Sequence, residues 1–166
     1  METKEKDYNR KKVIQYAKKW SYDRNPKYYN YDNIGGDCTN FISQCIFAGS
    51  GVMNYTITTG WYYRNANDKS ASWTGVEYLY KFLINNKGAG PQGMEANEKE
   101  IEIGDIAQLS FDGNTFAHSL VIVKKEGNDL NGIYIATHTF NAYERKISSY
   151  QFEKIRFIHI NKVLTY

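Results

Sequence analysis

The chain has 166 residues, a mass of 19.2 kDa and a formal net charge of +3. This length predicts a single domain over residues 1–166, with a core from about residue 8 to residue 160 that needs no disulfide to be stable. The mild charge, with no basic run interleaved with exposed aromatic residues, excludes a nucleic-acid groove. No apolar run approaches the roughly 18 residues of a membrane span.

The first seven residues are charged and lack the hydrophobic segment of a signal peptide. They predict a cytoplasmic protein, or a secreted or cell-wall-associated protein whose leader has been removed. The 15 tyrosines and 3 tryptophans favour an aromatic-rich core and shell over a binding platform, because tyrosine covers apolar surface while its hydroxyl stays in water. A cleft lined by such rings would still suit peptide or sugar ligands.

Residues 8–20 predict the first helix. One stripe of it carries Val13, Tyr16, Ala17 and Trp20. A polar, tyrosine-rich loop then runs to residue 36, where a second apolar-periodic run begins. In that run Phe41, Cys45 and Ala48 recur at helical spacing, which predicts a helix that starts after Asp37 as N-cap and stops at Gly49 or Gly51.

Cys38 falls in the first turn of this second helix. There the free N–H groups and the positive end of the helix dipole favour a thiolate, so we expect a thiol of lowered pKa that acts as a nucleophile. Cys45 lies nearly two turns further on, roughly 10 Å from Cys38 at about 1.5 Å per residue, too far for a disulfide. We expect Cys45 to be an inert core residue.

Residues 50–72 show no steady period and predict a long irregular segment, which in a compact domain is often functional. Trp61 and Trp73 lie in or beside it and are more often packing residues, yet they could wall a cleft beside the nucleophile. A third helix is predicted over residues 74–86, capped by Ser72 or Thr74, with Leu79 and Leu83 on its inner face.

After residue 90 the pattern changes to short apolar runs separated by turn residues. Strands are predicted over residues 106–111, 117–123, 132–139 and 155–160. Helices followed by an antiparallel sheet predict one α+β domain. No group of His, Cys, Asp and Glu has metal-ligand spacing and no glycine loop of the phosphate-binding type is present, so we expect neither a metal nor an organic cofactor.

Two histidines lie at ends of neighbouring predicted strands. His118 opens one strand and His138 ends the next, so in an antiparallel pair both lie at the same end of the sheet. A thiolate nucleophile needs an imidazole to accept its proton and a third polar group to hold that imidazole. Cys38 and His118 supply the first two, and either His138 or Asn141 supplies the third.

Three motifs together resemble a known family: Ile34-Gly35-Gly36-Asp37-Cys38-Thr39-Asn40-Phe41-Ile42-Ser43-Gln44-Cys45, Gly60-Trp61-Tyr62-Tyr63 and Ser72-Trp73-Thr74-Gly75-Val76. With Ala117-His118-Ser119 and His138-Thr139 they resemble the Amidase_6 domain of Gram-positive bacteria, within the papain-like NlpC/P60 and CHAP superfamily. The resemblance runs from about Tyr8 to Ile160.

This resemblance implies a papain-like fold, a Cys38 nucleophile, a His118 base and a His138 third residue, and it implies cleavage of amide bonds in peptide or peptidoglycan-fragment substrates. The family often carries Asp where this chain has Asn141. Tyr31 resembles the tyrosine that precedes the NlpC/P60 nucleophile and would polarise the substrate carbonyl. The remaining candidate binding residues are Asp37, Trp61 and Trp73.

Two other functions stay open at this point. One is a module of the same fold that binds peptide or glycan without turnover, which would have no need to keep a complete set of Cys38, His118 and a polar third residue. The other is acyl transfer of the transglutaminase kind, which uses the same Cys-His-polar order but delivers the acyl group to a second amine or thiol instead of water.

Overall fold

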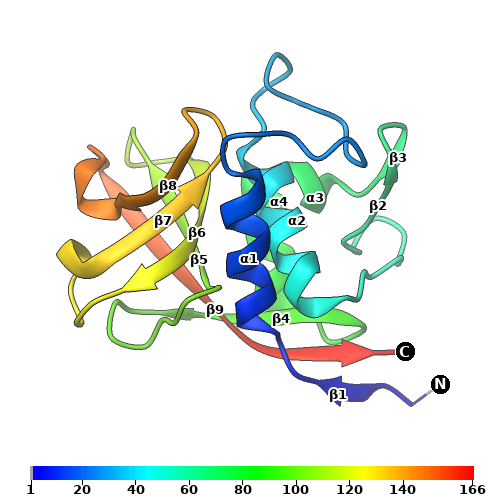
Figure 1. Cartoon of the computed structure of the whole chain (residues 1–166). Helices are drawn as coiled ribbons and strands as arrows, with labels where there is room; N and C mark the ends of the chain where they lie inside the picture. The colour runs from blue at the N-terminus through cyan, green and yellow to red at the C-terminus, as the bar shows by residue number, and fades with distance from the viewer. Residues whose placement is uncertain (1) are drawn as a thin grey trace.

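A computed structural model describes residues 2–166 and shows an α+β fold (Figure 1). The helices are α1 (Arg10–Trp20), α2 (Cys38–Ser50), α3 (Ala71–Thr74) and α4 (Val76–Asn85). The main sheet contains β1 (Lys4–Lys6), β4 (Gly90–Ala96), β5 (Ile106–Ser110), β6 (Phe116–Lys125), β7 (Ile133–Thr137), β8 (Ala142–Lys146) and β9 (Lys154–Thr165). A separate hairpin pairs β2 (Tyr63–Asn65) with β3 (Asp68–Lys69), and the 3-10 turns η1 (Leu130–Gly132) and η2 (Ile147–Ser149) flank β7 and β8.

The sheet is antiparallel, in the order β1-β9-β5-β6-β7-β8, with β4 on the other side of β9. The long strand β9 therefore pairs with three partners, β1, β4 and β5. The helices pack against one face of the sheet, and Figure 1 shows α1 and α2 side by side, to the right of strands β5–β8. No helix among residues 2–166 is long and apolar enough to cross a membrane.

Side chains of β6 alternate between two hydrophobic clusters. Val121 and Val123 pack in the cluster between sheet and helices, whereas Leu120 and Ile122 pack in a second cluster on the other face. Because successive side chains of a strand point to opposite faces, this alternation also decides the direction of the residues that open β6. Ser119 lies on the helix side and His118 on the side of Leu120.

Helix α2 is almost fully buried, and it ends at Gly51, whose φ of 67° is the left-handed conformation that favours glycine. Gly49 does not end α2 as expected but lies against the beginning of α1. A Cβ there would lie 2.4 Å from Val13 Cγ2 and 3.0 Å from the Asn9 carbonyl oxygen. The glycine therefore permits two helices to touch.

Several elements differ from the sequence prediction. Strands β1, β4 and β8 were not predicted, and residues 50–72 hold the β2–β3 hairpin and a bridge between Asn54 and Trp61. β4 begins with Gly90-Pro91, residues that are rare in strands, and pairs with β9 across a bulge after Gln92. Helix α4 begins after Gly75, and Ser72 instead donates to the Gly60 carbonyl.

Candidate active site

The start of α2, the start of β6 and the end of β7 meet at one end of the molecule, uppermost in Figure 1, where the α1–α2 loop (residues 21–37) runs over them. The Thr39 and Ser119 hydroxyls lie 2.9 Å apart and join α2 to β6. Ser119 also accepts from Gln108 Nε2 on β5. These contacts fix the position of the first turn of α2 relative to strands β5 and β6.

The Cys38 thiol is nearly buried, with 8% of the residue exposed. Its Sγ lies 3.8 Å from Thr39 Oγ1 and near the backbone N–H of Ser119. Burial raises the pKa of this thiol above its ordinary value, and the Ser119 N–H opposes that rise. The expected low pKa is therefore wrong, because removal from water outweighs the hydrogen bonds from Ser119 and Thr39 that lower the pKa. Cys45 is fully buried in the core.

His118 lies on the far face of β6 from the helices, between the rings of Phe111 and Tyr150, whose centroids are 6.4 and 6.0 Å away. Its Nε2 is 3.5 Å from Thr137 Oγ1. Burial, helped by the Arg145 charge, lowers the pKa of His118 to about 4, so the imidazole is neutral at pH 7. Among residues 2–166 no hydrogen bond joins this ring to Cys38.

His138 is on the helix side, where its ring stacks on Phe41 at 3.9 Å. Its Nδ1 lies 2.5 Å from Asp37 Oδ2, and its Nε2 lies 2.7 Å from the Trp20 carbonyl and 3.1 Å from Arg24 Nη1. Both ring nitrogens are therefore engaged away from His118. His138 therefore does not make the expected contact with His118. Instead, His138 joins the start of α2 to the end of α1.

The buried side chain of Asp37 stabilises this connection between the start of α2 and the end of α1. Its carboxylate accepts from His138, from the Tyr31 N–H and from Asn40 Nδ2, and it caps no backbone N–H of α2. Its own N–H donates to Thr139 Oγ1. Asp37 is only 1% exposed, so its side chain stabilises the start of α2. This burial corrects the expectation that Asp37 contacts a ligand.

Asn141 is exposed, and its Oδ1 accepts from Arg24 Nη2. The same guanidinium makes two hydrogen bonds to Asp32. Arg24 thus fastens the α1–α2 loop to the β7–β8 turn. Sequence analysis missed Arg24, because an isolated arginine in a polar loop gives no signal of partners more than 100 residues away.

The Tyr31 hydroxyl is buried and has no hydrogen-bond partner among residues 2–166. Burial raises its pKa to about 12, so the group remains a proton donor. Its ring packs edge-on against Tyr29 at 4.9 Å. The role expected of Tyr31 toward a substrate oxygen stays a prediction.

Trp61 and Trp73 are fully buried, with ring centroids 4.8 Å apart. Trp61 Nε1 donates to Ser43 Oγ and Trp73 Nε1 to Asn40 Oδ1, each at 3.0 Å. Both indoles thus support the buried side of α2. They are core residues and not walls of a cleft, which corrects their candidate binding role.

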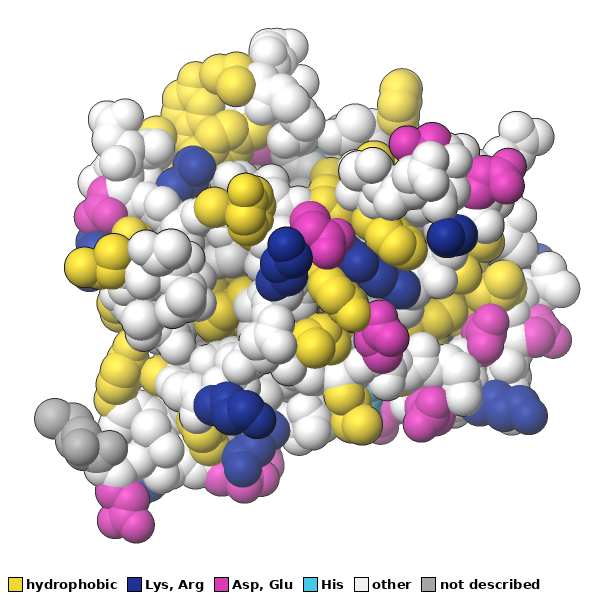
Figure 2. All heavy atoms as spheres, turned by 180° about the vertical axis from the view of Figure 1, so that it is seen from behind, with side chains coloured by type: hydrophobic (Ala, Val, Ile, Leu, Met, Phe, Trp, Pro, Cys, Tyr) yellow, Lys and Arg dark blue, Asp and Glu magenta, His cyan; other side chains and the backbone are white. Residues whose placement is uncertain are grey.

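Three prominent hollows lie on the surface formed by residues 2–166, and neither Cys38 nor His118 lines these three. The one of about 730 Å³ is lined by Phe111 and Tyr150, the two aromatic neighbours of His118. Another, of about 490 Å³, lies between residues 54–60 and α4. On the face seen in Figure 2, acidic and basic side chains are interspersed, with no broad area of one sign.

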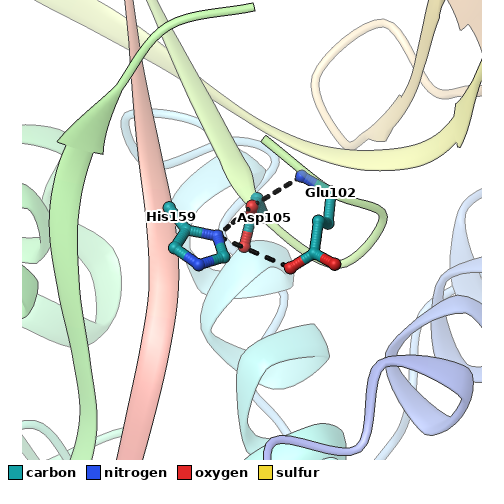
Figure 3. A group of neighbouring side chains, drawn as sticks. All are labelled: Glu102, Asp105 and His159. Carbon is teal, nitrogen blue, oxygen red and sulfur yellow. Dashed lines mark hydrogen bonds and ion pairs between the residues drawn. The ribbon is translucent and has the colours of Figure 1, made fainter. Parts of the chain in front are cut away.

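One group of ligand-type side chains occurs among the described residues, formed by Glu102, Asp105 and His159 (Figure 3). The buried Asp105 carboxylate already accepts from the His159 ring, from Arg10 Nη1 at 2.7 Å and from the backbone N–H groups of Glu102 and Ile160. Arg10 therefore supplies the positive charge that this carboxylate needs. The group fits a buried ion-pair network joining α1, β5 and β9 better than a metal centre.

Comparison with known proteins places the chain in a family. The sequence pattern of Amidase_6, described as "Putative amidase domain", matches residues 7–161. The chain belongs to this family. The family's name points to a hydrolase that acts on amides.

The chain is also 33% identical over 127 residues to "Uncharacterized protein YhbB" of Bacillus subtilis (strain 168). That similarity covers 74% of this chain and 39% of the Bacillus protein, so this amidase-family chain matches well under half of its relative's length. No solved structure was found to match the chain.

Proposed function

We propose that this Amidase_6 chain is a cysteine amidase of the papain-like type, with Cys38 as nucleophile and His118 as general base. The observation that carries the proposal is the position of the Cys38 thiol at the first residue of α2, against the backbone of β6 one residue from His118. Family membership supports an amide substrate. A peptide of the bacterial cell wall is the substrate class that the family resemblance implies.

In the proposed reaction His118 accepts the thiol proton and the Cys38 sulfur bonds to the carbonyl carbon of the amide. The C–N bond then breaks, and the amine leaves with the proton from His118. Water attacks the resulting thioester and releases the carboxylic acid. The N–H of Cys38, which has no acceptor within its own helix, and the unpartnered Tyr31 hydroxyl are the donors available to the developing oxyanion.

His118 is the better base of the two histidines near the nucleophile. The nitrogens of His138 are held by Asp37, Trp20 and Arg24, whereas the His118 ring has one weak polar contact, to Thr137. A neutral imidazole can accept a proton, which suits a buried, uncharged thiol. Since His118 points away from the helices, the proposal includes a rearrangement of the backbone at the start of β6 that brings the His118 ring to Cys38 when substrate binds.

Alanine variants of the two cysteines and the two histidines test this proposal. Mass spectrometry after iodoacetamide treatment should place the label on Cys38 and not on Cys45. Hydrolysis of purified peptidoglycan fragments should fall on the order of 10³-fold or more in Cys38→Ala and in His118→Ala, with Cys45→Ala as the matched control. Full activity in His118→Ala would refute the assignment of the base.

A binding module without turnover is the second candidate. It is favoured by the raised pKa of the Cys38 thiol and by the missing hydrogen bond between Cys38 and His118. For such a module, Cys38→Ala would bind peptidoglycan fragments as well as the native protein does, and neither protein would release new amino groups from them.

A further inference from the structure

The β7–β8 turn beside the candidate site adopts an unfavourable backbone. Thr139 and Phe140, the two central residues of the turn, both have a φ of 61°. Turns with two left-handed central residues strongly prefer Asn-Gly, and a β-branched or bulky residue there is strained. Figure 1 shows this turn at the same end of the molecule as the C-terminal end of α1.

Contacts within the chain account for Thr139 but not for Phe140. The Thr139 hydroxyl accepts the N–H of Asp37, the residue before Cys38, so its strained position helps to fix the start of α2. Phe140 instead exposes 87% of its surface, the highest value among the exposed large hydrophobic residues of the described chain. Phe140 thus combines a strained backbone with a solvent-exposed apolar ring that packs little against the protein.

Other exposed hydrophobic side chains lie on the loop that this turn contacts. Tyr22 is 68% exposed and its hydroxyl accepts from the Tyr143 N–H on β8, and Ile34, three residues before Asp37, is 61% exposed. The nearby guanidinium of Arg24 is occupied by Asp32 and Asn141. The rim of the candidate site therefore offers apolar surface, and the Arg24 charge beside it is already paired.

We propose that Phe140 is a specificity-determining residue that contacts an apolar, preferably aromatic, side chain of the substrate next to the amide attacked by Cys38. The inference rests on the proposed function, since it takes Cys38 as the nucleophile. Phe140 follows Thr139, whose hydroxyl accepts the N–H of Asp37, the residue before Cys38, so the backbone of this turn is joined to the start of α2. Strained residues cluster at active sites and ligand clamps, where the strain is part of the mechanism.

Two thiol reagents test this without any turnover. Iodoacetanilide and iodoacetamide alkylate by the same chemistry, and the first adds a phenyl ring. The ratio of their rate constants at Cys38 cancels the intrinsic reactivity of the thiol. The native protein should favour iodoacetanilide, and Phe140→Gly should lower that ratio about 5- to 10-fold, while Phe140→Trp keeps it.

The same Phe140→Gly variant should be more stable than the native protein, with a Tm raised by about 2–4 °C, because glycine adopts this backbone without strain. Thr58→Gly is the matched control, since Thr58 has a φ of 70° but lies in the loop between α2 and β2. That control should raise the Tm and leave the reagent ratio unchanged. A ratio unchanged in Phe140→Gly, or lowered equally in Thr58→Gly, would overturn the proposal.

A second measurement separates this inference from the amidase proposal. The Cys38→Ala protein cannot turn over substrate, and it should bind N-acetyl-phenylalaninamide more tightly than N-acetyl-alaninamide when titrated by NMR. Adding Phe140→Gly should abolish that preference. Persistence of the preference in the double variant would contradict the role of Phe140, whatever the amidase assays of His118→Ala show.

Discussion

His118 illustrates how one buried side chain can be both available for catalysis and costly for stability. It is 7% exposed, it has one polar contact at 3.5 Å, and the charge of Arg145 opposes its protonation. A neutral imidazole is the form that accepts a proton. The same features make the protonated form unfavourable in the folded state, so the residue couples folding to pH.

We predict that the free energy of unfolding rises with pH between about 4 and about 6.5 because of His118. The pKa is about 4 when folded and near the ordinary 6.5 when unfolded. Between these values the unfolded chain binds more protons, so stability increases with pH by about 2–3 kcal/mol across the window and is lost as pH falls through it. Urea unfolding at pH 4.5 and pH 7 measures this difference.

His118→Gln should reduce that pH dependence, since glutamine does not titrate. Comparing the native protein with the variant removes the contribution of the carboxylates, which titrate in part of the same range. An unchanged slope in His118→Gln would mean that the ring is charged or solvated when folded, and would also weaken its assignment as a neutral base.

At the scale of elements, the packing of α1 on α2 positions the candidate nucleophile. The Trp20 carbonyl at the end of α1 binds His138, which in turn binds Asp37 at the start of α2. Near their other ends the two helices are in contact at Gly49, whose missing side chain leaves room for Val13 and the Asn9 carbonyl. Any separation of the helices there would tilt the first turn of α2 relative to β6.

Gly49→Ala should therefore destabilise the protein by about 2–3 kcal/mol, because the added Cβ would lie too close to a stiff Val13 side chain and to backbone at Asn9. Gly127→Ala is the control. Gly127 has a φ of +83° but nothing within 4 Å of an added Cβ, so only the backbone cost of about 1 kcal/mol applies. Equal losses in the two variants, measured by urea unfolding, would show that helix packing at Gly49 is loose.

The whole molecule shows which features a sequence discloses. The helices α1, α2 and α4 and the strands β5, β6, β7 and β9 were predicted because apolar periodicity is a local property. The strands that were missed, such as β4 with its Gly-Pro start, depend on pairing with β9 from far along the chain. The positions of Cys38 and of the two strand ends were also predictable.

The contacts between residues within the candidate site could not be predicted from the sequence. Which face of β6 His118 occupies depends on which hydrophobic cluster its neighbours join, and the partners of His138 come from the end of α1 and the loop before α2. Burial likewise sets the raised pKa of Cys38, and burial is a property of the assembled fold. Spacing along the chain carries none of this information.

Two buried carboxylates contact opposite ends of α1. We expect both to stabilise the fold and only one of them, Asp37, to affect the candidate nucleophile. Asp105 is tied to Arg10 at the beginning of the helix, and Asp37 is joined through His138 to Trp20 at its end. Replacing either by alanine leaves positive or polar partners without their acceptor. We expect each variant to lose about 3–5 kcal/mol of unfolding free energy.

The two variants should differ at Cys38. Asp37→Ala loosens the first turn of α2, so it should change the rate of Cys38 alkylation by iodoacetamide under folding conditions, in addition to lowering stability. Asp105→Ala should keep the native alkylation rate at temperatures where it is still folded, because its network joins α1, β5 and β9 at the end away from Cys38. Stopped-flow alkylation at low temperature, with circular dichroism to verify folding, distinguishes the two. If Asp105→Ala altered Cys38 reactivity as much as Asp37→Ala, the helix would transmit disturbances along its whole length and the separation of roles would be wrong.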